Sequence, residues 1–255
     1  MRLKDKVIIV TGGTKGIGRT IALAAAAEGA KVVIGGRDAE GGRTFVEEVK
    51  QNTPGDGMFV KGDLTSVDCC RELVEETVRK YGKLDGLVNY AGTVLSMAPI
   101  TETTEEQFDS IMSINFKSAF FVTKYAVKVM QENGGGSIIN MGSMHAYGGE
   151  IDRTAYACSK GAMYTLYKHI AKNYAKDLIR CNWITIGWVA TPGELALRKE
   201  QGVGEDWLNE VGSNYFPMGR LQTPEDYTDS ALFLLGDGSS QVTGTEIFVT
   251  GGFMF

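Results

Sequence analysis

Two residues one helical turn apart, Tyr156 and Lys160, carry side chains suited to acid–base chemistry. At a spacing of i, i+4 on a predicted helix, the phenol and the ammonium group share one face. By itself such a pair is common, and a core tyrosine beside an exposed lysine is its ordinary interpretation. Ser143, however, directly follows a predicted strand at 137–141, and parallel sheets bind ligands at the carboxyl ends of their strands. Asn115 interrupts a long helical stretch, where an amide is costly unless it serves a polar partner.

A glycine-rich loop supplies a second kind of chemistry. It reads T-G-G-T-K-G-I-G over residues 11–18 and lies between a predicted strand at 7–10 and a predicted helix at 19–29. Glycines let a phosphate approach the backbone, and the helix N-terminus offers free N–H groups. The order G-x-x-x-G-x-G is not the commoner G-x-G-x-x-G, and a purely structural turn is the alternative. The position directly after a strand favours phosphate binding by Gly12, Thr14, Lys15, Gly16, Ile17 and Gly18.

The residues after the second predicted strand indicate which dinucleotide binds. An NAD enzyme carries a carboxylate there for the ribose 2′-hydroxyl, whereas a cation suits the 2′-phosphate of NADP. Gly36 occupies the carboxylate position, Arg37 follows it, and Lys15 adds a second cation. We expect Asp38 to begin the next helix and to point away. NADP(H) is therefore favoured over NAD(H), unless Lys15 and Arg37 are only solvated surface charges.

The elements around these residues alternate between short apolar strands and longer helices. Further strands are predicted at 32–34, 58–60, 87–88, 137–141, 180–186 and 246–249, and further helices at 39–51, 67–81, 105–130, 154–176 and 225–235. Such alternation predicts an α/β fold, a Rossmann-like doubly wound parallel sheet of about seven strands with helices on both faces. No linker interrupts the pattern, so we expect one domain over 1–255.

Two helix starts and one irregular region carry local signals. Thr103 is predicted to be an N-cap whose capping box is closed by Glu106. Pro224 stands at a first helical position, where its missing N–H costs nothing. Residues 192–216, with several glycines including Gly204, form the least regular region, which we interpret as a mobile lid over the site. A plain surface loop with a helix is the alternative.

Composition excludes several function classes. The 255 residues contain 26 Lys and Arg against 31 Asp and Glu, which gives a net charge of −5 without a basic run, so nucleic-acid binding is not expected. Two histidines and four cysteines without C-x-x-C spacing give no metal site and suggest a reduced, cytoplasmic protein. No apolar segment is long enough to span a membrane, and no signal peptide is recognised.

Taken together, these motifs resemble those of the short-chain dehydrogenase/reductase family along essentially the whole chain. The T-G-x-x-x-G-x-G loop stands at 11–18, and the family's N-x-A-G motif stands at 89–92. The family's catalytic tetrad is matched in order and spacing by Asn115, Ser143, Tyr156 and Lys160. Two positions depart from the family pattern: Ile186 replaces the usual proline before Gly187, and Tyr90 stands where asparagine is frequent.

The resemblance implies a role for each member of the tetrad. Tyr156 is the general acid/base, Ser143 hydrogen-bonds the reacting oxygen, Lys160 binds the nicotinamide ribose and lowers the tyrosine pKa, and Asn115 holds a water in a proton relay. A fall of the tyrosine pKa from ~10 to ~7 corresponds to ~4 kcal/mol. One cation at ~4 Å supplies about that energy at an effective dielectric constant near 20.

The resemblance also assigns residues to the cofactor. Besides the glycine loop and Arg37, it places at the cofactor Asp63, Leu64, Asn89, Ala91, Gly92, Tyr156, Lys160, Gly187, Val189 and Thr191. It implies an oxidoreductase that interconverts an alcohol and a ketone, assembled as a homotetramer or homodimer. We expect the apolar C-terminal end, 251–255, to contribute to a subunit contact.

The substrate side is less specific. His145, Glu150 and Trp188 are candidate pocket residues, and this polar edge would suit a hydroxylated or sugar-like substrate. Solvent or a neighbouring subunit is the alternative surrounding for the charges at 150–153. An NAD-dependent sugar or polyol dehydrogenase and a non-catalytic NADP-binding regulatory protein are alternative functions. A lyase or dehalogenase on this fold is disfavoured, since such proteins abandon the dinucleotide loop and this chain keeps it.

Overall fold

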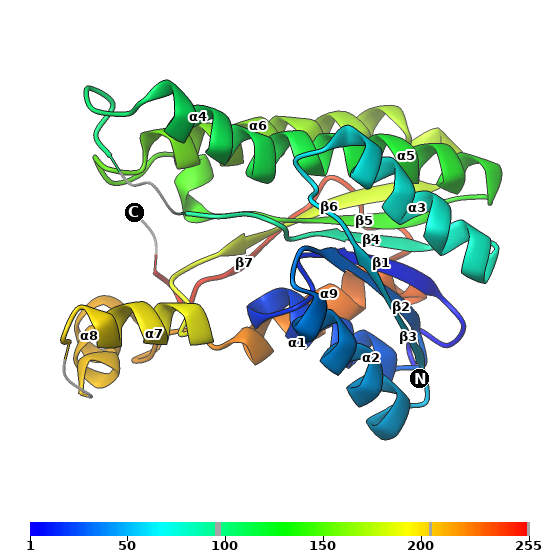
Figure 1. Ribbon diagram of the computed structural model, residues 1–255, viewed down its shortest axis with the longest axis horizontal. Helices are drawn as coiled ribbons and strands as arrows, with labels where there is room; N and C mark the ends of the chain where they lie inside the picture. The colour runs from blue at the N-terminus through cyan, green and yellow to red at the C-terminus, as the bar shows by residue number, and fades with distance from the viewer. Residues whose placement is uncertain (95–97, 204–205, 254–255) are drawn as a thin grey trace.

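A single parallel sheet organises the chain (Figure 1). The computed structural model describes residues 1–94, 98–203 and 206–253. Its strands are β1 Val7–Thr11, β2 Lys31–Gly36, β3 Asp56–Lys61, β4 Gly86–Asn89, β5 Gly136–Met141, β6 Ile179–Ile186 and β7 Glu246–Val249. They pair in the order β3-β2-β1-β4-β5-β6-β7, with every pair parallel. The predicted doubly wound α/β fold is confirmed.

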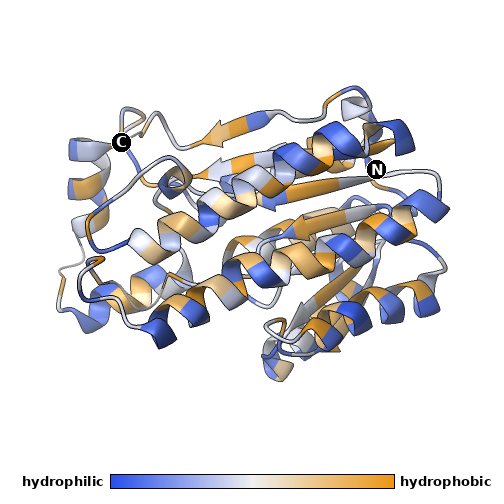
Figure 2. Ribbon diagram, turned by 90° about the horizontal axis from the view of Figure 1, so that it is seen from above, coloured by the Kyte–Doolittle hydropathy of each residue, from blue (hydrophilic) through white to orange (hydrophobic). Residues whose placement is uncertain are grey.

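Helices cover both faces of the sheet. On one face lie α1 Gly16–Ala27, α2 Ala39–Asn52 and α9 Thr228–Leu235; on the other lie α3 Val67–Tyr81, α4 Glu105–Met112, α5 Ser118–Glu132 and α6 Thr154–Asn173 (Figure 1). Successive strand residues point to opposite faces, so Ile8 and Val10 enter one core cluster and Ile9 the other. Figure 2 shows the result, with apolar strands beneath helices whose polar residues face outward. Burial on both faces explains the continuous apolar strands.

The strand order reverses beside β1, and this reversal creates the place for a ligand. β1 pairs with β2 on one side and β4 on the other, so the connections that leave β1 and β4 diverge to opposite faces. The two loops are joined by the Thr11 hydroxyl, which accepts hydrogen bonds from the backbone N–H groups of Tyr90 at 3.0 Å and Ala91 at 3.1 Å. The glycine loop and the N-x-A-G segment therefore lie side by side at the carboxyl edge of the sheet.

The long helical stretch predicted at 105–130 is not one regular α-helix. It consists of α4 and α5 joined by a π-helical turn, Ser113–Lys117, with Asn115 at its centre. The stretch begins at Glu105 as predicted, but the predicted capping box is wrong by one residue. Thr104, not Thr103, is the N-cap, and the capping box is closed by Gln107 rather than Glu106.

Short 3₁₀ turns complete the remaining segments: Met144–Ala146, Ala175–Asp177, Pro224–Tyr227 and Asp237–Ser239. Pro224 occupies the first position of its turn, as predicted, and Asp226 closes a capping box with Thr223. The helix predicted at 225–235 is therefore a 3₁₀ turn followed by α9.

The prediction that 192–216 is the least regular region is wrong. It contains α7 Pro192–Glu200 and α8 Trp207–Tyr215, which lie apart from the sheet at the lower left of Figure 1. The Thr191 hydroxyl caps α7 by accepting from the Glu194 N–H, and Pro192 fills the first position. Gly204 lies outside the described residues.

A small apolar cluster of its own holds these two helices. Trp207, Phe216 and Leu221 are buried in it, and Trp188 packs against them. Of the apolar C-terminal end, Phe253 stacks on Phe216 within the same chain, with ring centroids 4.7 Å apart. Residues 254 and 255 lie outside the described part of the chain.

Neither a membrane-spanning helix nor a metal-ligand cluster is present in the described residues. None of the helices within 1–94, 98–203 and 206–253 combines the length and the apolar character needed to cross a bilayer. In the same part of the chain, no three His, Cys, Asp or Glu side chains are grouped so that they could hold a metal ion.

Candidate active site

The glycine loop leaves the start of α1 open. Gly12 and Gly16 have φ angles of +70° and +56°, a backbone conformation that side-chain-bearing residues rarely adopt. A Cβ on Gly12 would lie 3.0 Å from the Ala91 Cα, whereas one on Gly16 would meet nothing closer than 3.6 Å. Lys15 is the N-cap of α1, yet no side chain caps the helix and its first turn contains no acidic residue. Such an N-terminus fits an anionic group such as a dinucleotide pyrophosphate.

Gly18 and Ile17, in the first turn of α1, pack against the glycine loop. A Cβ on Gly18 would lie 2.6 Å from both the Gly12 carbonyl oxygen and the Tyr90 ring, and Ile17 is buried in the core. These two residues set how closely α1 packs under the loop. We therefore expect Gly18 and Ile17 to influence cofactor binding through the shape of the loop backbone.

The end of β2 presents a cation beside open space. A Cβ on Gly36 would meet only the Thr14 methyl group, at 3.7 Å. The Arg37 guanidinium is exposed and pairs loosely with the Asp63 carboxylate, at 3.9 Å. Lys15 is exposed as well. Both cations are free enough to meet a phosphate at this edge.

Asp38 points away from that edge, as predicted. It caps α2, and its carboxylate accepts from the Gly41 N–H at 3.0 Å. Asp63 is held on the other side by the backbone N–H of Thr65, which lowers the pKa of the Asp63 carboxyl. The neighbouring Leu64 is buried.

Asn89 ties the second ligand-facing loop to its neighbours. Its amide donates to the Thr123 hydroxyl at 2.9 Å and to the side-chain oxygen of Asn140 at 3.0 Å. Its own side-chain oxygen is buried without a hydrogen bond. Asn89 therefore positions the segment that contains Ala91 and Gly92, and it lies inside the fold rather than on the open face of the site.

Asn115 occupies the π-helical turn and is fully buried. Its side-chain oxygen accepts from the Thr93 N–H at 2.7 Å. Its amide donates to the Thr93 carbonyl at 2.9 Å and to the Ser159 hydroxyl at 3.0 Å. The side chain is thus committed to protein partners, and the costly polar group in the helix is satisfied.

Tyr156, Ser143 and Lys160 converge where β5 ends and α6 begins. The Lys160 ammonium donates to the Met141 carbonyl at 3.1 Å and lies 5.7 Å from the centroid of the Tyr156 ring. Burial lowers the pKa of Lys160 to about 8. The structure therefore brings together three members of the predicted tetrad on adjacent elements.

Burial also raises the pKa of the Tyr156 phenol, and two groups oppose this. They are a hydrogen bond with Ser143 and the positive charge of Arg153. Lys160, to which the sequence resemblance assigns this effect, is not among the groups that lower the pKa here. Arg153 was not singled out as a site residue, although its place three residues before Tyr156 at the start of α6 could have indicated it.

His145 and Glu150 lie beside the same tyrosine. The His145 ring is edge-on to the Tyr156 ring, with centroids 5.5 Å apart. Its Nε2 is 3.3 Å from the Glu150 carboxylate, and its Nδ1 is 3.4 Å from the Ser143 hydroxyl. Arg153 Nε lies 3.4 Å from the same Glu150 carboxylate. The charges at 150–153 therefore pair with one another beside Tyr156.

Trp188 is anchored to α7. Its indole N–H donates to Glu194 at 2.9 Å, and Glu194 also pairs with Arg198 at 2.9 Å. The Arg198 guanidinium lies 5.3 Å from the Trp188 ring and 5.6 Å from the Trp207 ring. We call this cluster the Trp188–Arg198 latch (Trp188, Glu194, Arg198 and Trp207). Sequence reasoning identified only Trp188 among its members, although the i, i+4 spacing of Glu194 and Arg198 was a usable signal.

The segment after β6 connects this latch to the glycine loop. A Cβ on Gly187 would lie 2.6 Å from the Gln222 side chain, and Val189 pairs with Gln222 in a short bridge. The Thr191 methyl group lies 3.9 Å from where a Cβ on Gly16 would be. Thr191 therefore faces the glycine loop, and its hydroxyl caps α7.

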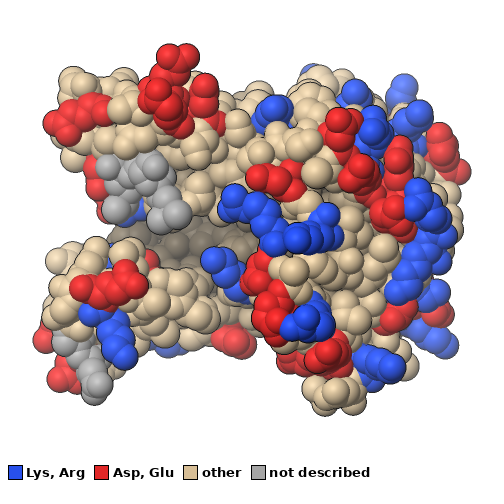
Figure 3. All heavy atoms as spheres, in the orientation of Figure 1, with Lys and Arg blue, Asp and Glu red and all other residues tan. Residues whose placement is uncertain are grey.

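A hollow separates the two sides of the molecule (Figure 3). It opens between the upper helices α4 and α6 and the lower pair α7 and α8, and Lys and Arg side chains gather along its inner side. The carboxyl ends of the strands point toward it (Figure 1). This is where a dinucleotide and a small substrate could lie together.

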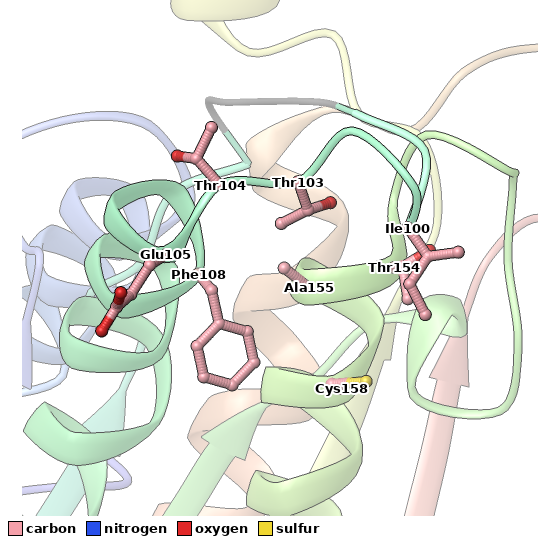
Figure 4. Close-up of a pocket in the computed structure, with 8 residues that line it drawn as sticks. All are labelled: Ile100, Thr103, Thr104, Glu105, Phe108, Thr154, Ala155 and Cys158. Atoms are coloured by element: carbon pink, nitrogen blue, oxygen red, sulfur yellow. The ribbon is translucent and has the colours of Figure 1, made fainter.

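A second cavity, of about 300 Å³, lies between the N-terminal ends of α4 and α6 (Figure 4). Its largest apolar group is Phe108, and Cys158 contributes an exposed thiol. Cys158 is two residues from Tyr156, and residues so spaced do not share a helix face. The cavity is thus separate from the catalytic tetrad.

Comparison with known proteins agrees with this geometry. Residues 12–254 match the family described as enoyl-(acyl carrier protein) reductase. A structure of a short-chain type dehydrogenase/reductase from Mycobacterium marinum superposes with a TM-score of 0.86 at 28% identity, covering 98% of this chain and 95% of that one. The chain belongs to the short-chain dehydrogenase/reductase family. It is an oxidoreductase of a family whose members bind NAD(P)(H).

Curated relatives differ in their substrates. The chain is 36% identical to the glucose and ribitol dehydrogenase homolog of Oryza sativa subsp. japonica, over 98% of this chain and 86% of that protein. It is 35% identical to the 3-oxoacyl-[acyl-carrier-protein] reductase of Thermotoga maritima, over 99% of both. Similarity at this level establishes the family and leaves the substrate open.

Proposed function

We propose that the chain is an NADP(H)-dependent oxidoreductase that interconverts a secondary alcohol and a ketone. One observation carries the proposal: Ser143, Tyr156 and Lys160 converge at the carboxyl edge of the sheet, beside an uncapped helix N-terminus in a glycine loop. The alternatives are an NAD-dependent sugar or polyol dehydrogenase of the same family and a non-catalytic regulatory protein. The intact tyrosine and lysine argue against the latter.

Each catalytic side chain has a part in proton transfer. When bound, NADP(H) supplies or accepts the hydride. Tyr156 donates a proton to the carbonyl oxygen in reduction and removes it from the hydroxyl in oxidation. Ser143 donates a hydrogen bond that orients this oxygen. Lys160, fixed by the Met141 carbonyl, holds a positive charge near the phenol and binds the nicotinamide ribose.

Asn115 has a role through its position in the π-helical turn. Its side chain is bonded to Thr93 and Ser159, so a relay water could use only the remaining lone pairs of these groups or the backbone of the turn. We assign Asn115 to holding the turn in place for such a water. This role is structural support of the relay, and the side chain does not itself transfer the proton.

Positive charge and open space where the adenosine end of the cofactor would lie favour NADP(H) over NAD(H). Arg37 and Lys15 can meet a 2′-phosphate, which carries about −1.5 to −2 charges. Gly36 leaves room where a carboxylate would repel it. The remaining contacts are assigned to Gly12, Thr14, Gly16, Ile17, Gly18, Asp63, Leu64, Asn89, Ala91, Gly92, Gly187, Val189 and Thr191.

The substrate enters from the side of α7 and α8. We assign residues 192–216 as a lid within a single domain, anchored by the Trp188–Arg198 latch. His145 and Glu150 contribute polar groups next to Tyr156. Such an edge suits a hydroxylated substrate, a class to which the name of the rice relative also points.

Steady-state kinetics test the proposal. Sugars and polyols, hydroxy acids and apolar secondary alcohols are each offered with NADP⁺ and with NAD⁺, and the absorbance of the reduced cofactor is followed. We expect turnover with at least one class and a higher kcat/KM for NADP⁺. Comparable kcat/KM values for the two cofactors would contradict the cofactor assignment, and no turnover with any class would contradict the reaction.

We further propose a homotetramer or homodimer in the cytoplasm. This proposal rests on the family resemblance. The apolar C-terminal end does not support it, because Phe253 packs on Phe216 within the same chain. Light scattering measures the assembly directly. A monomer at micromolar concentration would contradict it.

A further inference from the structure

Three groups surround the Ser143 hydroxyl, and two of them can accept its single hydrogen. It accepts a hydrogen bond from the backbone N–H of His145 at 3.2 Å. It is 3.4 Å from His145 Nδ1 and hydrogen-bonds with the Tyr156 phenol. A hydroxyl has one hydrogen to donate and two lone pairs that accept. The direction of its single O–H therefore depends on what the His145 ring offers.

The structure holds the His145 ring in a defined orientation. Its Nε2 lies 3.3 Å from a Glu150 carboxylate oxygen, and its side chain is 16% exposed. The Tyr156 ring meets it edge-on, and a Cβ on Gly149 would lie 2.6 Å from its Cδ2. An ionised carboxylate only accepts hydrogen bonds, so Glu150 keeps the proton of a neutral His145 on Nε2. Nδ1 is then an acceptor.

The two protonation states of His145 have opposite effects on Ser143. With His145 neutral, the Nδ1 lone pair attracts the Ser143 hydrogen and draws it away from Tyr156. With His145 protonated, Nδ1–H donates to the Ser143 oxygen, and both serine lone pairs are occupied by donors from His145. The serine hydrogen is then available only to the reacting oxygen or to the Tyr156 phenol.

We infer that His145 is a positioning residue whose protonation state sets the direction of the Ser143 hydrogen bond and thereby the rate of carbonyl reduction. The inference rests on the proposed function, in which Ser143 donates to the carbonyl oxygen. In this inference, Glu150 fixes the tautomer of His145 by holding the proton of the neutral ring on Nε2. Neither residue touches the reacting atoms in this account.

The residues around His145 determine the pH at which its ring becomes protonated, and this pH is acidic. They are Glu150, Asp152 and Arg153 from the loop before α6, and Tyr156 from α6 itself. Burial lowers the pKa of His145 below its usual 6.5, and the Arg153 charge acts in the same direction, while Glu150 and Asp152 oppose it. Below this pKa the ring is protonated and Ser143 points to the substrate. Carbonyl reduction should therefore become faster as the pH falls through it.

The test is the pH dependence of kcat/KM for carbonyl reduction with the best ketone. We expect a rise of about threefold to tenfold as the pH falls through the His145 pKa, the range of one net hydrogen bond. His145→Asn, whose amide does not titrate, should lose this limb. His169→Asn changes the other histidine of the sequence, which is exposed on α6, and should keep it.

The variant Glu150→Gln should shift the pH-dependent limb instead of removing it. The neutral amide removes a charge that raises the His145 pKa, so the limb should move to lower pH. A limb that persists unchanged in His145→Asn would overturn the inference, as would a limb that His169→Asn removes.

A second measurement does not depend on turnover. Nitrogen chemical shifts of the His145 ring, assigned by comparison with His145→Asn, report its tautomer in the intact protein with NADPH. We expect the Nε2–H tautomer at neutral pH. An Nδ1–H tautomer would overturn the inference even if the reaction is as proposed. Absence of any alcohol or ketone turnover together with the Nε2–H tautomer would instead contradict the proposed function.

Discussion

The cofactor side and the substrate side of the hollow are built differently. On the cofactor side the shape comes from backbone: Gly12, Gly16 and Gly18 hold a turn in which an added Cβ would meet main-chain atoms or open ligand space. On the substrate side the shape comes from charged and aromatic side chains, in the latch and around His145. Backbone packing tolerates little change, whereas side-chain networks can be replaced one group at a time. A conserved reaction and a variable substrate can therefore share one fold.

The largest effect should follow from a methyl group in the glycine loop. In Gly18→Ala the new Cβ would lie 2.6 Å from the Gly12 carbonyl oxygen, so the loop or α1 must shift. We expect NADPH binding to weaken at least about tenfold and the melting temperature to fall, since overpacking costs ~1–3 kcal/mol. Gly238→Ala is the matched control, because a Cβ there meets nothing within 4 Å. Equal binding by the two variants would contradict a backbone-built site.

A charge at the end of β2 should change the cofactor preference. In Gly36→Asp the carboxylate has space and would repel a 2′-phosphate. We expect the ratio of kcat/KM for NADPH to that for NADH to fall about tenfold or more. Gly36→Asn is isosteric and uncharged, so it separates charge from size. If Gly36→Asn lowers the ratio as much as Gly36→Asp, electrostatic discrimination is not the cause.

Loss of the Trp188–Arg198 latch should weaken substrate binding and leave NADPH binding unchanged. In Arg198→Met the ion pair with Glu194 and the contacts with two indole rings are lost, each worth about 0.5–1 kcal/mol. We expect the KM for the substrate to rise about threefold to tenfold with an unchanged Kd for NADPH. Lys199→Met, at an exposed position on the same helix, is the control. A weakened NADPH affinity in Arg198→Met alone would remove the distinction between the two sides.

A further prediction concerns stability instead of binding or turnover, namely the folding cost of burying the Lys160 ammonium group. Burial lowers the pKa of Lys160 to about 8, against 10.5 in an exposed chain. The unfolded chain binds more protons between these values, so stability rises with pH from about 8 to 10.5, and the cost is fully present below pH 8. Lys160→Met removes ~3 kcal/mol of this cost and loses a hydrogen bond of ~1 kcal/mol.

At pH 7 Lys160→Met should therefore unfold with a free energy about 2 kcal/mol higher than the native chain, in urea titrations, while activity is lost. Lys199→Met should leave the unfolding free energy unchanged at both pH 7 and pH 10. A Lys160→Met protein that is less stable at pH 7 would show that the lysine is structurally favourable.

The parts of the fold that the sequence predicts best are those fixed by simple periodicity. The strand β7 and the helix α3 begin and end where the apolar pattern indicates. In α3 the buried residues form one face of the helix, which makes its pattern easy to read. The order of the tetrad is readable as well, because it is what the family resemblance implies. Thr103 and Thr104 are harder to distinguish, because either can cap and only the backbone bond to Gln107 decides.

Other features depend on contacts that no local pattern records. The helices α7 and α8 are short and have few apolar residues, and the apolar cluster beside them includes Trp188 and Phe253 from other segments of the chain. The threonine and proline at 191–192 were a usable signal for α7 that composition obscured. Arg153 acts on Tyr156 through space, and its part in the site becomes visible only once the loop before α6 is folded.

Single-turnover reduction by Tyr156→Phe tests the central claim most directly. The enzyme is mixed with NADPH and its best ketone, and loss of NADPH absorbance is compared with the native chain, while NADPH binding is measured separately by fluorescence. The account predicts NADPH affinity within about twofold of native and a rate lower by about 10³-fold, because the phenol is the acid that delivers the proton. A Tyr156→Phe protein that binds NADPH and reduces the ketone at a rate within tenfold of native would contradict it.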